Sequence, residues 1–216
     1  RGDRRLDLLV LSHRDSDHTG GARSLFAALD VAAVASSLED GHPLLDGARP
    51  ARRCIAGEQW QWDGVDFVVL HPSADDYARS VRPNAMSCVL RVSAGGRSVL
   101  LTGDIEREQE SRLVIDGAAL KSDVLVVPHH GSKTSSSAAF LDAVRPRIAV
   151  FQAGYRNRFG HPAPDVVERY RERGIAVVAT AVCGAWQWRA DGAEDGSCER
   201  DVERRYWHHR IVADPR

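Results

Sequence analysis

The sequence lacks the features that would mark a membrane-spanning, zinc-ribbon or repeat protein. No apolar run in its 216 residues approaches the roughly 18 residues needed to cross a bilayer, and no internal repeat or low-complexity segment stands out. Its four cysteines show no Cys-x-x-Cys spacing, which argues against a zinc ribbon. The formal net charge of −1 argues against strong, non-specific nucleic-acid binding by the whole domain. A globular domain of ordinary composition remains.

Potential metal ligands gather directly after the apolar run 6–11. Four of them fall within six residues: His13, Asp15, Asp17 and His18. The segment 22–29 that follows is rich in Ala and Leu and predicts a helix. Histidine nitrogens with carboxylate oxygens suit Zn²⁺, Mn²⁺ or Fe. A solvated polar loop is the alternative, but its interleaved acidic groups would repel one another without a cation.

Three further motifs follow later in the chain. They are Leu-Leu-Thr-Gly-Asp at 100–104, Val-Pro-His-His-Gly-Ser-Lys-Thr-Ser at 127–135 and Asn-Arg-Phe-Gly-His-Pro at 157–162. His13, Asp104 and the pair His129 and His130 each lie just beyond the end of a predicted strand. A sheet brings its strand ends to one edge, so we expect these residues to share a cleft.

Together these motifs, over residues 6 to about 180, resemble those of the metallo-β-lactamase superfamily. The first resembles the His-x-His-x-Asp-His signature, with Asp15 in place of the second His. This variant, the His-His-Gly-Ser block and the late loop most resemble the C-terminal domain of ComEC-type competence proteins. Those proteins are membrane channels that admit single-stranded DNA into bacteria. The resemblance implies an α/β fold, the αββα sandwich of two mixed β-sheets flanked by helices.

The resemblance also implies that the chain is a fragment of a larger membrane protein. It opens with Arg1, and one strand precedes the first motif where the superfamily has several, so we expect the N-terminal strands to be missing. We expect one hydrolase domain over 1–216, with 190–216 a basic C-terminal tail that contacts phosphates or is simply solvated. Its expected partners are DNA, single-stranded above all, the membrane channel domain of the same protein and other DNA-uptake components. The domain would face the extracytoplasmic (periplasmic) side of the inner membrane.

The implied site holds two divalent metal ions and no organic cofactor. The first metal would take His13 and Asp15, the second Asp17 and His18, and Asp104 would bridge the two. The full set of expected ligands is His13, Asp15, Asp17, His18, Asp104, His130 and His129.

One of the two adjacent histidines should complete the second metal's ligands. We favour His130, because the Gly-Ser turn after it can swing it toward the cleft; His129 would then hold a ligand or a substrate oxygen. Asn84 stands where the superfamily's third motif usually supplies a His, and His71 is a weaker substitute that more often lies at the surface. With Asp15 this makes the first site oxygen-rich, which favours Mn²⁺, with Zn²⁺ or Mg²⁺ as alternatives.

The resemblance implies a metal-dependent phosphodiesterase, a nuclease that degrades the DNA strand not imported during natural transformation. The expected catalytic residues are Asp17, Asp104 and His161, and the expected substrate-binding residues are Asn84, Ser132 and Lys133. Ser132 and Thr134 could instead cap a helix that begins near residue 136. A small-molecule esterase or lactonase and a non-catalytic DNA-binding module are the alternatives. The first needs an enclosed apolar pocket, and the second needs a lost ligand.

Periodicity predicts the secondary structure around these motifs. The expected strands are 6–11, 32–35, 59–62, 65–70, 87–92, 98–102, 124–127, 148–151 and 175–179, and the expected helices are 22–29, 106–115, 136–144 and 165–173. Asp165 with Glu168 predicts a capping arrangement at the start of the last helix. Cys88 reads as a small core residue, whereas Cys183 and Cys198 could form a disulfide in an oxidising space.

Overall fold

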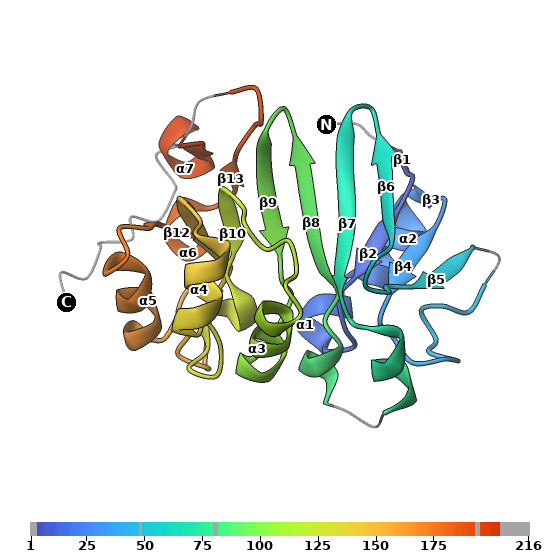
Figure 1. The fold of residues 1–216 in the computed structure, drawn as a ribbon. Coiled ribbons are helices and arrows are strands. Elements are labelled where there is room, and N and C mark those ends of the chain that lie inside the picture. The colour runs from blue at the N-terminus through green and yellow to red at the C-terminus, as the bar shows by residue number, and fades with distance from the viewer. Residues whose placement is uncertain (1–3, 48, 80–81, 193–194, 204–216) are drawn as a thin grey trace.

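Two β-sheets pack face to face, with helices on their outer surfaces (Figure 1). The computed structural model describes residues 4–47, 49–79, 82–192 and 195–203 of the chain. The smaller sheet has three parallel strands, β2 (Leu9–Leu11), β4 (Val34–Ser36) and β5 (Ala51–Arg53). A short parallel pair lies beside it, β1 (Arg5–Leu6) with β3 (Asp30–Val31).

The larger sheet has seven strands and changes direction in its middle. Its strands are β6 (Gln59–Trp62), β7 (Val65–His71), β8 (Val89–Ala94), β9 (Arg97–Leu101), β10 (Val124–Val126), β11 (Ile148–Phe151) and β12 (Ala176–Ala179). Strands β6 to β9 pair antiparallel and β9 to β12 pair parallel. The parallel half brings the carboxyl ends of β9, β10 and β11 to one edge.

The helices are short and follow the strands. They are α1 (Ser16–Thr19), α2 (Ala22–Ala28), α3 (Arg107–Ile115), α4 (Ala138–Val144), α5 (Pro164–Arg171), α6 (Thr180–Cys183) and α7 (Glu199–Val202). The 3₁₀ turns are η1 (Ala74–Ala78), η2 (Pro83–Met86) and η3 (Pro128–Gly131). A small hairpin, β13 (Trp186–Gln187) with β14 (Ser197–Cys198), precedes α7.

The alternation of side chains along the strands creates the layers, because successive residues of a strand point to opposite faces. In β4, Val34 packs in the apolar cluster that contains α2, and Ala35 packs against the larger sheet. In β8, Leu90 faces the smaller sheet and Val89 faces the outer helices. This arrangement confirms the predicted two-sheet sandwich with helices outside.

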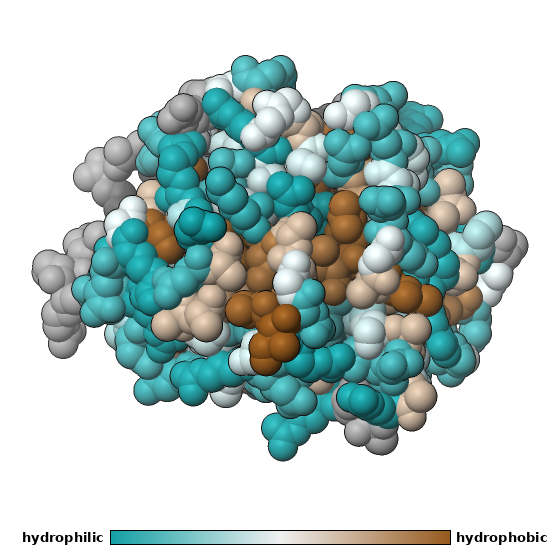
Figure 2. All heavy atoms as spheres, viewed as in Figure 1, coloured by the Kyte–Doolittle hydropathy of each residue, from teal (hydrophilic) through white to brown (hydrophobic). Residues whose placement is uncertain are grey.

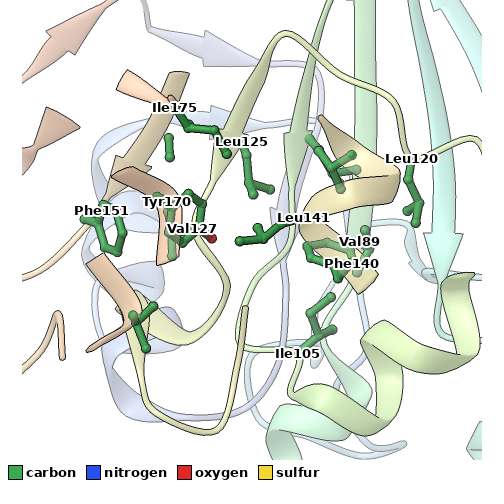
Figure 3. Packing of buried hydrophobic residues seen from close by; sticks show 14 of the residues in the cluster. Val89, Ile105, Leu120, Leu125, Val127, Phe140, Leu141, Phe151, Tyr170 and Ile175 are labelled. Atoms are coloured by element: carbon green, nitrogen blue, oxygen red, sulfur yellow. The ribbon is translucent and has the colours of Figure 1, made fainter. Parts of the chain in front are cut away.

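The outer face of the larger sheet carries the main core (Figure 3). Helix α4 contributes Phe140 and Leu141 and α5 contributes Tyr170, and all three pack with Leu125 of β10. Phe140 and Tyr170 are completely buried. Burying an apolar side chain of this size stabilises the fold by about 1.5–3 kcal/mol relative to exposure. The helices therefore fix the loops at the sheet edge.

Most predicted elements are present, and the differences have local causes. The run 6–11 is split into β1 and β2, because the chain bends at Asp7 and the two halves pair with different strands. The capping arrangement predicted from Asp165 and Glu168 is wrong. Helix α5 begins with Pro164, whose fixed φ suits the first helical position, and Ala163 precedes it without a side-chain cap.

All four cysteines form disulfides. The predicted pair Cys183–Cys198 is confirmed, and it ties α6 to β14. Cys88 lies in the core, as predicted, but the sequence did not reveal that it pairs with Cys54. Cys54 follows β5 of the smaller sheet and Cys88 precedes β8 of the larger one, so this bond joins the two layers. A pair separated by 34 residues is visible only once the sheets are packed.

The surface and the C-terminal segment complete the description. Figure 2 shows hydrophilic residues over most of the viewed face, with apolar residues gathered toward its middle. In the part of the chain that the structure describes, no helix is long and apolar enough to cross a bilayer. Within the predicted tail, Arg200 lies in α7 and donates a hydrogen bond to the carbonyl of Ala181. The tail's other basic and aromatic residues, within 204–210 and at Arg216, lie outside the described residues.

Candidate metal centre

The predicted motifs meet at one edge of the sandwich. The loops after β2, β9 and β10 carry His13 to His18, Asp104, and the pair His129 and His130. Strands β9 and β10 are parallel neighbours, so the loops after them lie side by side. The expected shared cleft is confirmed by contacts between these loops.

An unusual backbone directs the histidine pair. His129 and His130 have φ angles of 48° and 53°, and Gly131 continues in the same region with φ 81°. At Gly131 a Cβ atom would lie 2.8 Å from atoms of Phe151 and Pro162, so only glycine fits. Three successive left-handed residues turn the chain sharply, and both imidazoles reach back to the sheet edge.

Four side chains form a cluster that could hold a metal ion, with one ligand atom from each within 4.8 Å of the others: Asp17, His18, Asp104 and His130. Nε2 of His18 lies 3.2 Å from Oδ1 of Asp104 and 3.3 Å from Nε2 of His130. Nε2 of His130 lies 3.2 Å from Oδ2 of Asp17. The favoured member of the histidine pair, His130, is the one in this cluster.

The imidazole nitrogens on the far side of the cluster are occupied. Nδ1 of His130 lies 2.7 Å from the carbonyl oxygen of Gln152, so this nitrogen carries a proton and donates it. Nδ1 of His18 lies 3.0 Å from the hydroxyl of Ser12. A hydrogen bond on one ring nitrogen fixes the tautomer and leaves the other nitrogen's lone pair for a metal ion. The His130 ring, with its Nδ1 donating to Gln152, therefore offers Nε2 as a ligand.

His13 and Asp15 lie next to this cluster. Nε2 of His13 is 3.6 Å from Oδ2 of Asp15 and 4.0 Å from Oδ2 of Asp104. The His13 side chain is completely buried, and its Nε2 has no hydrogen-bond partner. A buried polar atom without a partner costs free energy, whereas a cation beside it would satisfy the nitrogen. These residues thus fit a second divalent ion.

Asp104 is the centre of the arrangement. Its Oδ1 faces His18, and its Oδ2 lies 3.5 Å from His130, 3.9 Å from His129 and 4.0 Å from His13. Burial alone would raise the pKa of Asp104, but the hydrogen bond and charge of His18, with the charges of His130 and His129, hold it below its usual value. Asp104 is therefore ionised and reaches both halves of the centre, as a bridging ligand must.

Ser87 supports the centre from behind. Its hydroxyl accepts a hydrogen bond from the backbone N–H of Asp104 at 2.9 Å and lies 3.3 Å from Nδ1 of His13. A Cβ atom at Gly103 would lie 2.9 Å from the Cβ of Ser87, so the missing side chain permits this approach. One hydroxyl thus positions a candidate ligand of each subsite.

Sequence reasoning missed Glu106. Its Oε1 lies 3.3 Å from Nδ1 of His129 and accepts a hydrogen bond from the Thr134 hydroxyl at 2.7 Å. On the other side of the ring, Nε2 of His129 lies 3.5 Å from the Asn84 amide nitrogen and 3.9 Å from Asp104. The Thr134 hydroxyl, which donates to Glu106, also lies 3.2 Å from Nδ1 of His129. Glu106 and Thr134 together therefore hold the His129 ring with Nε2 toward the centre, and Asn84 contacts that nitrogen.

His161 lies at the rim of the centre. Its ring centroid is 5.7 Å from that of His129 and 6.5 Å from that of His130. Burial, and then the charges of His129 and His130, lower the pKa of His161. The side chain of Asn157 holds the backbone of His161 on both sides, donating to its carbonyl and accepting from its N–H.

The loop after the histidine pair is turned partly inward. Ser132 is buried, its hydroxyl lies 3.1 Å from that of Thr134, and Lys133 is exposed. The alternative that Ser132 and Thr134 cap the next helix is wrong: Ser137 is the N-cap of α4, and it accepts from the N–H of Phe140. The substrate-binding roles of Ser132 and Lys133 stay predictions.

The sequence led us to expect His71 at the surface, and this expectation is wrong. His71 is buried and donates from Nδ1 to the carbonyl of Ser87 at 2.8 Å, so it supports the residue behind the centre.

Nearby, Arg112 binds both carboxylate oxygens of the buried Asp76 at 2.8 and 3.1 Å. Burial would raise the pKa of Asp76, but the hydrogen bonds from Arg112 and Ser73 lower it to about 2.

Two pockets have candidate ligands in their walls. One, of about 310 Å³, adjoins His13 and is lined by charged side chains that include Arg14, Arg53 and Arg79. The other, of about 340 Å³, adjoins the cluster of His18, Asp104 and His130, and its other walls include Val10, Leu90 and Leu101. One pocket beside the centre is therefore polar, and the other is largely apolar.

The geometry defines a two-sheet sandwich with a His/Asp metal-ligand cluster at its strand ends. The chain belongs to the metallo-beta-lactamase superfamily, whose family model matches residues 1–155. This membership indicates a metal-dependent hydrolase, and the cluster is consistent with divalent metal binding. Which side chains are ligands, and to which ions, stays a prediction.

Known relatives confirm the resemblance to competence proteins. The chain is 46% identical over 188 residues to Competence protein ComA of Neisseria gonorrhoeae, covering 87% of this chain and 26% of that protein. It is 34% identical over 198 residues to ComE operon protein 3 of Bacillus subtilis, covering 88% of this chain and 25% of that protein. The chain thus spans about a quarter of the length of these relatives.

Solved structures share the fold. CmlA, a diiron beta-hydroxylase from Streptomyces venezuelae, aligns with a TM-score of 0.53 at 15% identity, over 82% of this chain and 44% of that one. At this identity the likeness concerns the fold alone.

Proposed function

We propose that this chain is a metal-dependent phosphodiesterase that hydrolyses DNA during DNA uptake, degrading the strand that is not imported. The observation that carries the proposal is the convergence of four imidazoles on the buried carboxylate of Asp104. Two further carboxylates lie beside these imidazoles, Asp15 next to His13 and Asp17 next to His130. This is a donor set for two neighbouring divalent cations.

Two such cations, when bound, would supply an activated water and stabilise negative charge on a phosphodiester. The protein's own groups act around them. Glu106 orients His129 with its Nε2 toward Asp104, where a phosphate would bind, and His161 at the rim could donate a hydrogen bond to a phosphate oxygen. With Asp15 and Asn84 where imidazoles usually lie, we expect Mn²⁺ to be preferred over Zn²⁺.

The DNA substrate and the uptake role are supported by relatives named for competence. The part of these relatives that matches this chain is about a quarter of their length, so we expect a membrane channel domain and other uptake components as partners. The two disulfides support an oxidising environment, because such bonds persist in the periplasm and outside cells and are rare in the cytosol. We therefore place the domain on the extracytoplasmic side.

The proposal is tested by incubating the purified chain with single- and double-stranded DNA after removal of metals. Mn²⁺, Mg²⁺ and Zn²⁺ are then added back separately. We expect hydrolysis that needs a divalent ion, and chelation should abolish it. Folded chain that binds metal and leaves both DNA forms intact would contradict the proposal.

The apolar pocket beside the cluster favours a second candidate, a small-molecule esterase or lactonase. Val10, Leu90 and Leu101 could hold the acyl part of such a substrate next to Asp104. A panel of p-nitrophenyl esters and lactones distinguishes the two. Turnover of these without turnover of DNA would replace the first proposal with the second.

A further inference from the structure

The loop between β11 and α5 presents two aromatic side chains to solvent beside the centre. Phe159 is 65% exposed and Tyr155 is 46% exposed. Among the described residues, eight large apolar side chains are exposed, and two of them lie in this loop. An exposed aromatic at the rim of a candidate active site indicates a contact with a ligand.

Two arginines accompany these rings. The guanidinium carbon of Arg158 lies 4.9 Å from the centroid of the Phe159 ring, and that of Arg156 lies 5.2 Å from the Tyr155 ring. Residues 153–164 contain no Asp or Glu. The loop therefore carries positive charge next to a centre that is rich in carboxylates, and it offers both flat apolar faces and cations.

The loop is held in shape by one side chain. The Asn157 amide nitrogen donates to the carbonyls of Gly154 and His161 at 3.0 and 2.6 Å. Its oxygen accepts from the backbone N–H groups of Phe159 and His161 at 3.2 and 3.0 Å. With all these bonds made inside the loop, the aromatic side chains are presented on a fixed backbone, which lowers the entropy cost of binding a ligand.

The exposed ring of Phe159 is connected to the centre through the ring of His161. Phe159 stacks on His161 with 16° between the ring planes and 6.0 Å between the centroids. His161 in turn lies 6.5 Å from His130, with 24° between the planes. Two near-parallel ring contacts thus connect Phe159 to a candidate metal ligand. A flat group stacked on Phe159 would therefore lie beside the centre.

We propose that this loop is a stacking platform for single-stranded DNA, in which Phe159 stacks a base and Arg158 and Arg156 bind flanking phosphates. The proposal deepens the proposed function and rests on it, since it names unpaired DNA as the substrate. An aromatic ring accepts any base whose face is exposed, and duplex bases have no exposed face. The guanidinium on the Phe159 ring can move to a phosphate while a base takes its place.

The test measures equilibrium binding by fluorescence anisotropy with Mn²⁺ present. The two probes are an oligothymidylate with phosphorothioate linkages, which resist hydrolysis, and an abasic strand with the same linkages and length. We expect the chain to bind the thymidylate about tenfold more tightly, since base–aromatic stacking is worth roughly 1–3 kcal/mol. Phe159→Leu should remove most of that preference and leave binding of the abasic strand unchanged.

Charge and stacking are separated by a second variant. Arg158→Gln should lower the affinity for both probes by the same factor. It should also reduce the slope of log affinity against log salt concentration by about 0.7, the value for one phosphate contact on a single strand. Trp62→Leu and Arg145→Gln are the matched controls. Trp62 is a 45% exposed aromatic residue on β6. Arg145 is an exposed residue between α4 and the start of β11, whereas the platform loop follows the end of β11. Both should bind like the unaltered chain.

Equal binding of the two probes by the unaltered chain, or an unchanged preference in Phe159→Leu, would overturn the proposal. So would loss of binding to anionic lipid vesicles in Phe159→Leu with oligonucleotide binding intact. Base-dependent binding through Phe159 without DNA hydrolysis would support the platform and contradict the proposed nuclease. DNA hydrolysis that does not depend on Phe159 would support the proposed nuclease and contradict the platform, so the two failures are distinguishable.

Discussion

Replacing Glu106 should slow hydrolysis without removing metal. Its carboxylate lies 3.3 Å from Nδ1 of His129, and it also accepts from the Thr134 hydroxyl. A hydrogen bond to a charged group is worth about 1.5–3 kcal/mol, and each 1.4 kcal/mol is a factor of about ten. Glu106→Gln keeps an acceptor oxygen and removes the charge. We therefore expect kcat on single-stranded DNA to fall about 10- to 100-fold, with less change in KM.

The matched control lies on the same helix terminus. Glu106 and Gln109 form a capping box at the start of α3, in which the Gln109 side chain accepts from the N–H of Glu106. Gln109→Ala should lower the thermal stability by breaking this box, yet leave kcat and metal content near those of the unaltered chain. If Glu106→Gln retains its kcat within about twofold, or Gln109→Ala loses as much, the orienting role of Glu106 is refuted.

Three further predictions follow from the centre and its support. His130→Gln should reduce the metal bound per chain, whereas His129→Gln should mainly reduce kcat; metal analysis of both variants decides, and the reverse pattern would exchange the two roles. Hydrolysis should be fastest with Mn²⁺, and replacing Asp15 and Asn84 by His should shift the preference toward Zn²⁺; full activity of the unaltered chain with Zn²⁺ alone would contradict this. The pKa of Asp76 falls from 3.8 to about 2 on folding. The ionised carboxylate therefore stabilises the fold by about 2 kcal/mol above about pH 4, and this stabilisation is lost as the pH falls toward 2. Urea unfolding across this range should show the loss, and Asp76→Asn should not.

The sequence predicted the strand-end motifs well, because two physical signals coincide there. Apolar runs such as 124–127 have the length and composition of buried strands, and the polar motifs begin where these runs end. The parallel half of the larger sheet then brings Asp104 and His130 to one edge. The glycine after the pair permits the turn that brings His130 into the cluster, and the ligand role of His130 stays a prediction.

Other features depend on packing that no local pattern records. Glu106 with Gln109 reads as an ordinary helix start, and that signal conceals the contact of Glu106 with His129, 23 positions away in the sequence. The Cys54–Cys88 bond requires the two sheets to be in register. His71 precedes a proline at a strand end, a position typical of the surface, yet η1 and the loop of Ser87 cover it.

The central claim is that Asp104 joins two metal subsites, and the most direct test measures metal content and hydrolysis in Asp104→Asn. Bound Mn²⁺ per chain is determined after equilibration, and DNA cleavage is followed in the same preparation, with circular dichroism to verify the fold. We predict two ions per chain for the unaltered protein, and for Asp104→Asn the loss of at least one ion together with hydrolysis. Folded Asp104→Asn that keeps both ions and its full rate of hydrolysis would contradict the account.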